Sequence, residues 1–292
     1  MASFGRLMTA MVTPMRADLS VDYARAAELA ERLAATGSEG IVVSGTTGES
    51  PTLTSAEKLK LFETVVKAVG GKVAVIGGTG SYNTAESAEL SRHAEETGVD
   101  GLLLVTPYYN RPPQEGLYRH FRMVAEATKL PCILYNVPAR TAVNLAAKTT
   151  LRLAEIPNII GIKECADLGQ VADVVSGAPA GFSVWCGDDA ATLPYLAVGA
   201  YGIVSVAAHF VGPQMREMIA AFRSGRVDDA ATIHRQLIPM FRGLFAVVNP
   251  VLVKTGLDLT GFPVGPVRPP LADASPEERM ALQQVLVASG LL

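Results

Sequence analysis

A lysine at the end of an apolar run is the residue of this chain best suited to covalent chemistry. The run is Ile159-Ile160-Gly161-Ile162-Lys163, which is typical of a fully buried strand. An amine in poorly hydrated surroundings keeps a neutral, nucleophilic fraction near neutral pH, and it can form a Schiff base with a carbonyl substrate. The alternative is a strand-end lysine whose amine simply reaches solvent.

Two further side chains could assist such an amine. Tyr135 lies near the end of another apolar run, where its phenol could move protons while a carbinolamine forms and collapses. A core tyrosine with a satisfied hydroxyl is the plainer interpretation. Arg140 follows Pro138 by two residues, and its planar guanidinium suits bidentate capture of a carboxylate. A surface salt bridge is the alternative for this arginine.

The turn Gly45-Thr46-Thr47-Gly48 offers hydroxyl and backbone N–H groups in a small space, which suits a carboxylate. It lacks the lysine and the spacing of a Walker A loop. Taken alone, it is equally well explained as a hydroxyl-rich turn that caps a helix.

The candidate residues lie in or just after eight short apolar runs, which are separated by stretches of helical period. The runs are Leu7 to Val12, Gly40 to Ser44, Val73 to Gly77, Gly101 to Thr106, Pro131 to Asn136, Ile159 to Lys163, Phe182 to Gly187 and Gly202 to Val206. Eight strand-helix units close a barrel, and its catalytic groups sit at the carboxyl ends of the strands. We therefore predict a (β/α)8 TIM barrel over residues 1–224 and a C-terminal helical region, packed on the barrel, over residues 225–292.

Helix starts and stops support this organisation. Capping-box patterns occur at Thr54 with Glu57 and at Asn83 with Glu86, and Ser275-Pro276 with Glu278 opens the last predicted helix. The main alternative is an open doubly wound sheet. Its glycine-rich turn after the first strand is missing, so we expect no nucleotide site.

Composition excludes several function classes. The 292 residues carry a formal charge of −3 and no long run of like charge, so nucleic acid is not an expected partner. Residues 190–215 lack charged side chains, but prolines and glycines divide them, and we interpret them as helix, strand and helix rather than a membrane span. The N-terminus lacks signal-peptide features and the three cysteines lack paired spacing, which predicts a cytoplasmic protein with reduced thiols. The four scattered histidines and the absence of a GxSxG motif argue against a catalytic metal and a serine hydrolase.

Four motifs in register resemble the dihydrodipicolinate synthase family, which belongs to the pyruvate-lysine class I aldolase superfamily. They are Gly45-Thr46-Thr47-Gly48-Glu49, Val105-Thr106-Pro107-Tyr108-Tyr109-Asn110-Arg111-Pro112, Tyr135-Asn136-Val137-Pro138-Ala139-Arg140-Thr141 and Gly161-Ile162-Lys163-Glu164. The similarity runs from about Leu7 to the C-terminus. It implies a Schiff-base-forming lyase of the diaminopimelate route to lysine, in which pyruvate on Lys163 condenses with L-aspartate-4-semialdehyde without a cofactor.

The resemblance also implies residue roles and an assembly. Thr46, Tyr135 and Tyr109 would relay protons, with Tyr109 reaching into a neighbouring subunit's site of a homotetramer built as a dimer of dimers. The remaining implied substrate contacts are Thr47, Gly45 and Gly48 around the pyruvate carboxylate, Gly187 and the main chain of Val204 in the pyruvate pocket, and Arg140 on the semialdehyde carboxylate.

An effector site is implied as well, formed by Ser50, Tyr108, Glu86 and Lys58. Lysine-sensitive members often carry histidines where this chain has Ser55 and Lys58, so we expect weak or absent inhibition by lysine.

Thr141-Ala142 departs from the common Thr-Gly continuation of the family motif. A lyase acting on N-acetylneuraminate or a keto-deoxy sugar acid stays open as an alternative function, although such lyases usually lack the arginine at position 140. A non-catalytic barrel that binds a small carboxylic acid is the third interpretation.

Overall fold

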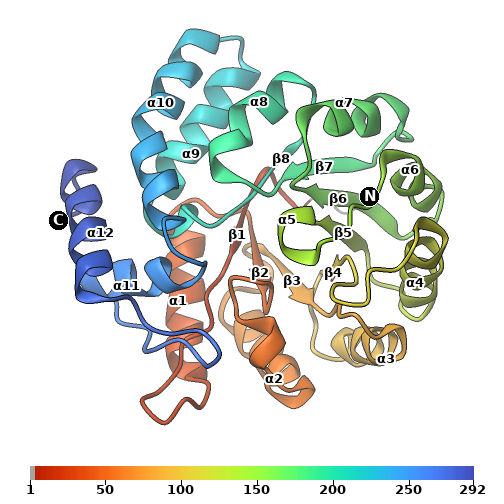
Figure 1. Cartoon of the computed structure of the whole chain (residues 1–292), viewed down its shortest axis with the longest axis horizontal. Coiled ribbons are helices and arrows are strands. Elements are labelled where there is room, and N and C mark those ends of the chain that lie inside the picture. The colour runs from red at the N-terminus through yellow and green to blue at the C-terminus, as the bar shows by residue number, and fades with distance from the viewer. Residues whose placement is uncertain (1–3) are drawn as a thin grey trace.

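A closed barrel of eight parallel strands forms the centre of the computed structural model, which describes residues 4–292 (Figure 1). The strands pair in sequence order, and β1 closes the barrel by pairing with β8. Their bounds are β1 Leu7–Ala10, β2 Gly40–Val43, β3 Ala74–Gly78, β4 Gly101–Val105, β5 Cys132–Asn136, β6 Ile159–Glu164, β7 Ser183–Cys186 and β8 Gly202–Ser205. All eight predicted runs are thus confirmed as strands, and the TIM barrel is confirmed as the fold class.

Helices surround the strands and continue beyond the eighth unit. Those that follow the strands are α1 Tyr23–Ala35, α2 Ser55–Val69, α3 Thr84–Glu95, α4 Gln114–Glu126, α5 Pro138–Thr141, α6 Ala147–Ala154, α7 Leu168–Gly177, α8 Thr192–Ala197 and α9 Ala208–Arg223. Short 3-10 turns lie at η1 Ser50–Thr52 and η2 Asp189–Ala191. The C-terminal helices are α10 Val227–Leu244, α11 Val251–Leu259 and α12 Pro276–Ala288. In Figure 1 they lie along one side of the barrel, with the C-terminus at its edge.

Two of the three predicted capping boxes are confirmed, and in the third only one of the two reciprocal hydrogen bonds forms. Thr54 with Glu57 and Ser275 with Glu278 make both reciprocal bonds. The Asn83 side chain does cap α3, but its own N–H donates to Ser81 Oγ at 3.0 Å rather than to Glu86. Glu86 is therefore available to face the second cavity described below.

The strands are apolar because both of their faces are covered. Inward side chains fill the barrel and outward ones pack under the helices, so β1, β2 and β8 are buried at every position. Charged groups enter only at the carboxyl ends, where Lys163 and Glu164 close β6. Successive strand residues face opposite ways, so these two side chains project to opposite sides of the sheet.

The charge-free segment of residues 190–215 is confirmed as η2 and α8, strand β8 and the start of α9. Within residues 4–292, no helix combines the length and apolarity that a membrane span needs. The expectation of no signal peptide rests partly on residues 1–3, which lie outside the described residues.

Candidate active site

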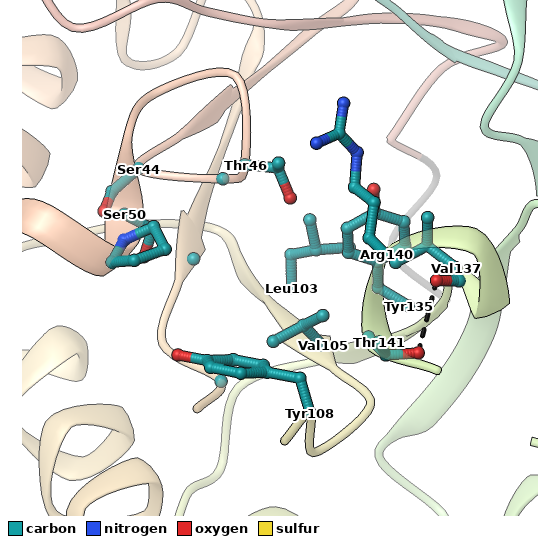
Figure 2. A pocket seen from close by; sticks show the side chains of 14 residues that line it. Ser44, Thr46, Ser50, Leu103, Val105, Tyr108, Tyr135, Val137, Arg140 and Thr141 are labelled. Atoms are coloured by element: carbon teal, nitrogen blue, oxygen red, sulfur yellow. Dashed lines mark hydrogen bonds between the residues drawn. The ribbon is translucent and has the colours of Figure 1, made fainter. Parts of the chain in front are cut away.

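A cavity opens at the carboxyl ends of β2, β4 and β5 (Figure 2). Its walls carry three of the predicted site side chains, Thr46, Tyr135 and Arg140, together with Gly45. The other lining residues are Ser44, Ser50, Pro51, Gly78, Gly80, Leu103, Val105, Tyr108, Val137 and Thr141. Residues more than ninety positions apart in the sequence therefore meet at one end of the barrel, where the fold class predicts a site.

Lys163 lies beside this cavity rather than in its wall. Register pairs it with Tyr135 on β5, and its Nζ is 4.4 Å from the centroid of the Tyr135 ring. Both side chains are buried, at 5 % exposure each. Among residues 4–292 the amine has no carboxylate within ion-pairing distance. The surroundings are thus an aromatic ring and apolar strand atoms, which rules out the alternative of a solvent-seeking lysine.

Gly187 gives the Lys163 side chain its room. A Cβ at position 187 would lie 2.9 Å from Lys163 Cε and still closer to Cys165 Sγ, so any other residue would push the lysine aside. Gly187 follows β7, the strand next to β6. The space beside the Lys163 amine therefore requires glycine at position 187.

The turn after β2 is sharply folded. Ser44 and Glu49 both adopt positive φ, at 56° and 57°. A Cβ on Gly48 would lie 3.0 Å from the Ser44 backbone and 3.1 Å from Met11 O, so the turn needs glycine there. Thr46 lines the cavity, whereas Thr47 is turned inward at 3 % exposure, and its Oγ1 accepts from Asn249 Nδ2 at 2.8 Å.

Arg140 projects from the one-turn helix α5 at the rim of the cavity (Figure 2). It is exposed, and no carboxylate in residues 4–292 pairs with it, so the salt-bridge alternative fails. A guanidinium without an anionic partner at the mouth of a cavity can receive a substrate carboxylate. Thr141 closes α5 by donating to Val137 O at 3.2 Å.

Glu164 anchors the segment that carries α5. Its Oε1 accepts from Asn136 Nδ2 at 2.8 Å and from the Cys165 and Ala166 N–H groups at 2.9 Å, while its Oε2 accepts from Gln170 Nε2 at 3.1 Å. Burial raises the pKa of Glu164 to about 7, although these hydrogen bonds lower it. The network holds both ends of the residue 136–145 loop, so it sets where Arg140 can reach.

Three further predicted residues lie outside the cavity wall, in addition to Lys163, Thr47 and Gly187. Tyr109 is 91 % exposed, at a positive φ of 64°, and does not line this cavity. Val204 is buried within β8. Gly48 lies beneath the turn, against Ser44 and Met11.

A second cavity adjoins the first and brings together all four predicted effector residues, Ser50, Tyr108, Glu86 and Lys58. It shares Ser50, Pro51, Gly80 and Tyr108 with the first cavity. Burial lowers the pKa of Lys58, and the Glu86 carboxylate opposes this. Burial also raises the pKa of Tyr108, with smaller contributions from Tyr82 and Glu86.

Sequence reasoning missed four polar residues around the site, namely Ser44, Glu164, Asn249 and Lys254. Ser44 Oγ and Asn249 Oδ1 are buried without a hydrogen-bond partner in the described chain. The only available signal was a polar or charged residue inside an apolar stretch, as for Lys254 in Val251-Leu252-Val253-Lys254. Over residues 4–292, no group of three or more His, Cys, Asp or Glu side chains is arranged to hold a metal ion.

The fold and these contacts define a class. A parallel eight-stranded barrel with a buried lysine near the carboxyl end of β6, set against a tyrosine from β5, is typical of Schiff-base-forming lyases of the class I aldolase type. The family model described as the dihydrodipicolinate synthetase family matches residues 3–289, and the chain belongs to this family.

Several known proteins are similar over the whole chain. The 4-hydroxy-tetrahydrodipicolinate synthase of Symbiobacterium thermophilum is 70 % identical over all of both chains, and that of Heliobacterium modesticaldum is 57 % identical over 99 % of this chain and 96 % of its own. The solved dihydrodipicolinate synthase of Cyanidioschyzon merolae, with lysine bound, superposes with a TM-score of 0.97 at 45 % identity and covers 99 % of both chains. A monomeric dihydrodipicolinate synthase variant, 39 % identical, superposes with a TM-score of 0.96 over 99 % of this chain and 98 % of its own.

Proposed function

We propose that this chain is a 4-hydroxy-tetrahydrodipicolinate synthase that condenses pyruvate with L-aspartate-4-semialdehyde on Lys163. The observation that carries the proposal is the buried Lys163 amine, 4.4 Å from the Tyr135 ring and free of any acidic partner in the described chain. Arg140 at the cavity mouth supports the second substrate, because that substrate brings a carboxylate. The names of relatives that are 50 to 70 % identical agree.

The reaction follows from imine chemistry. Lys163 Nζ adds to the keto carbon of pyruvate, and loss of water leaves an imine. The imine is a better electron sink than the ketone, so a methyl proton leaves and an enamine forms. The enamine carbon attacks the aldehyde carbon of the semialdehyde, whose oxygen becomes a hydroxyl. The amino group of the same substrate then attacks the imine carbon, closes the ring and releases the lysine amine.

Proton transfer and carboxylate binding are assigned to the surrounding residues. Thr46 and Tyr135, both at the cavity, pass protons during imine formation, together with Tyr109 from another subunit. The Gly45 to Gly48 turn with Thr47 holds the pyruvate carboxylate, and Arg140 holds that of the semialdehyde. Gly187 and the main chain of Val204 complete the pyruvate pocket on the Lys163 side.

A shared tyrosine requires an assembly. Tyr109 is exposed and does not line the cavity of its own chain, so we assign its contribution to the site of a second copy. We place it in a homotetramer, made of two dimers, in the cytoplasm. Size-exclusion chromatography with light scattering tests the assembly, and a fully active monomer would contradict the role of Tyr109. Residues 1–224 act as the catalytic barrel and residues 225–292 as the helical region.

Borohydride trapping is the direct test of the mechanism. With pyruvate present, reduction should add one reduced pyruvyl mass to Lys163, located by peptide mass spectrometry. The Lys163→Ala variant should lose the adduct and nearly all turnover, whereas the control Lys148→Ala, which changes an exposed lysine, should keep both. An adduct on another residue, or none, would contradict the proposal. A sugar-acid lyase would form the same adduct, so a substrate panel must show turnover with aspartate semialdehyde.

A further inference from the structure

The turn that follows β2 is held from behind by residues about two hundred positions later in the chain. Asn249 Nδ2 donates to Thr47 Oγ1 at 2.8 Å, and Lys254 Nζ pairs with Glu49 Oε1 at 2.7 Å. The Arg268 N–H donates to Glu49 Oε2 at 2.7 Å. Each contact joins the C-terminal segment to the turn that carries Thr46 and Thr47.

The ion pair in this linkage is fully enclosed. The Lys254 side chain is 3 % exposed and that of Glu49 is 0 % exposed. Removing two charges from water costs several kcal/mol of free energy per ion, which their mutual attraction must offset. Apolar residues of similar volume often stabilise the fold as well or better. The pair is therefore poorly explained by stability alone. What it does achieve is to place Glu49, at a positive φ, in one orientation at the end of the turn.

The Asn249 bond also decides what the Thr47 hydroxyl can do. A hydroxyl has one hydrogen and two lone pairs, so accepting the amide N–H leaves the Thr47 hydrogen free to donate elsewhere. Asn249 Oδ1 has no partner among the described residues, which is an unfavourable state for a buried acceptor. The Asn249 amide therefore fixes which way the Thr47 hydroxyl hydrogen can point.

We propose that Asn249, Lys254 and Glu49 are positioning residues that orient the turn to receive the carboxylate of pyruvate. Asn249 directs the Thr47 hydrogen toward that carboxylate, and the Lys254–Glu49 pair locks the turn behind it. The C-terminal segment is therefore part of the substrate site through its contacts, although none of its residues lines the cavity. This inference rests on the proposed function and deepens it.

The first experiment measures the pyruvate concentration that gives half-maximal borohydride trapping on Lys163. This readout needs no second substrate. Asn249→Ala should raise that concentration about tenfold, the effect of losing one well-placed hydrogen bond worth about 1.4 kcal/mol. In turnover assays, the KM for pyruvate should rise while the KM for aspartate semialdehyde stays within about twofold. Arg279→Met is the matched control, because it removes a 2.7 Å ion pair to Asp258 that lies in the same C-terminal segment but away from the turn.

The second experiment separates positioning from folding. Lys254→Met alone leaves a buried carboxylate unpaired and is expected to unfold readily. The double variant Glu49→Gln with Lys254→Met removes both charges and keeps an acceptor for the Arg268 N–H. It should melt near the wild-type temperature and still need about tenfold more pyruvate for trapping.

The outcomes are distinct. A wild-type protein that traps no pyruvate would contradict the proposed function and this inference with it. The wild type could instead trap pyruvate while the Asn249→Ala variant and the double variant need no more pyruvate than the wild type for half-maximal trapping. That result would overturn this inference and leave the proposed function standing. Equal increases in KM for both substrates would also overturn it, because they would indicate a general loss of structure.

Discussion

Three lysines are buried in the described chain, and their neighbours give each a different task. Lys254 has a carboxylate at 2.7 Å and is therefore a structural cation. Lys58 faces the second cavity with Glu86 near it. Lys163 alone has an aromatic ring and no acidic partner, which suits a nucleophile. Residue type cannot distinguish these lysines, but the atoms around each amine can.

The second cavity supports a prediction about regulation by lysine. Lys58 lines the second cavity, so a cationic ligand bound there would meet a like charge, and like charges repel at short range. We expect lysine to inhibit weakly or not at all, and half-inhibition by submillimolar lysine in a steady-state assay would show this to be wrong. A Lys58→Gln variant, which removes the charge at a residue that does not line the first cavity, should become more sensitive to lysine than the wild type.

At the scale of elements, backbone strain concentrates in the loops that build the site. Six described residues other than glycine adopt positive φ, and five of them follow β2, β4 or β5, namely Ser44, Glu49, Tyr109, Arg111 and Ala142. Such conformations persist where the surrounding structure enforces them, and they gather at functional sites. The strands form a rigid frame, and the strained turns after them carry the polar groups of the site.

Ala142 permits a test of this strain. It ends α5 at a φ of 55°, a conformation that costs a residue with a Cβ about 1 kcal/mol and glycine almost nothing. Ala142→Gly should therefore raise the free energy of unfolding by about 1 kcal/mol in urea denaturation.

The control for this prediction is Ala139→Gly, an exposed position in the same short helix. There glycine should lower stability by about 0.5 to 1 kcal/mol. A loss of stability in both variants would mean that Ala142 carries no relievable strain.

At the scale of the whole molecule, the barrel and the C-terminal segment form one packed unit. Besides the contacts to the turn, Arg268 pairs with Glu57 on α2 at 2.7 Å and donates to Thr52 O at 2.7 Å. The Arg268 guanidinium lowers the pKa of Glu57 to about 2. The far end of the chain thus closes over the helix and turn that follow β2, so deletion of the C-terminal helices would disturb the site as well as stability.

Barrel closure itself should respond to pH through His209. This buried side chain bridges the segments after β1 and β8, because its Nε2 accepts from the Val12 N–H at 3.3 Å and its Nδ1 donates to Val206 O at 2.8 Å. Burial lowers the pKa of His209 to about 4. The folded state therefore binds fewer protons than the unfolded state between about pH 4 and 6.5, so stability is fully present above pH 6.5 and falls as the pH is lowered.

The expected loss for this one group is about 2 kcal/mol between pH 6.5 and pH 5, since each pKa unit is worth 1.36 kcal/mol. Glu164 changes stability in the opposite direction, because its pKa is higher in the folded state than in the unfolded chain. Its contribution to stability is fully present below the pKa of the unfolded chain and is lost as the pH rises through about 7. The difference in urea stability between the wild type and His209→Gln isolates the histidine. A difference that does not change between pH 7 and pH 5 would contradict the assignment.

Local pattern was sufficient for much of this protein. Strand positions, the order of strand and helix, and the closed barrel follow from short apolar runs with polar ends, because burial of both strand faces demands apolar sequence. The same rule identified the strand ends that carry Thr46, Tyr135, Arg140 and Lys163, since in this fold the strands bring their carboxyl ends to one face. The family motifs assigned roles to them.

Tertiary structure alone decided the contacts between distant segments. That Glu49 pairs with Lys254, that Asn249 orients Thr47 and that Glu164 holds the loop of Arg140 could not be predicted from spacing. A buried polar group must find a partner wherever the fold brings one within about 3 Å, and that partner is chosen by packing rather than by distance along the chain. The sequence determined which side chains could do the chemistry, and the closed barrel determined which of them are held in place to do it.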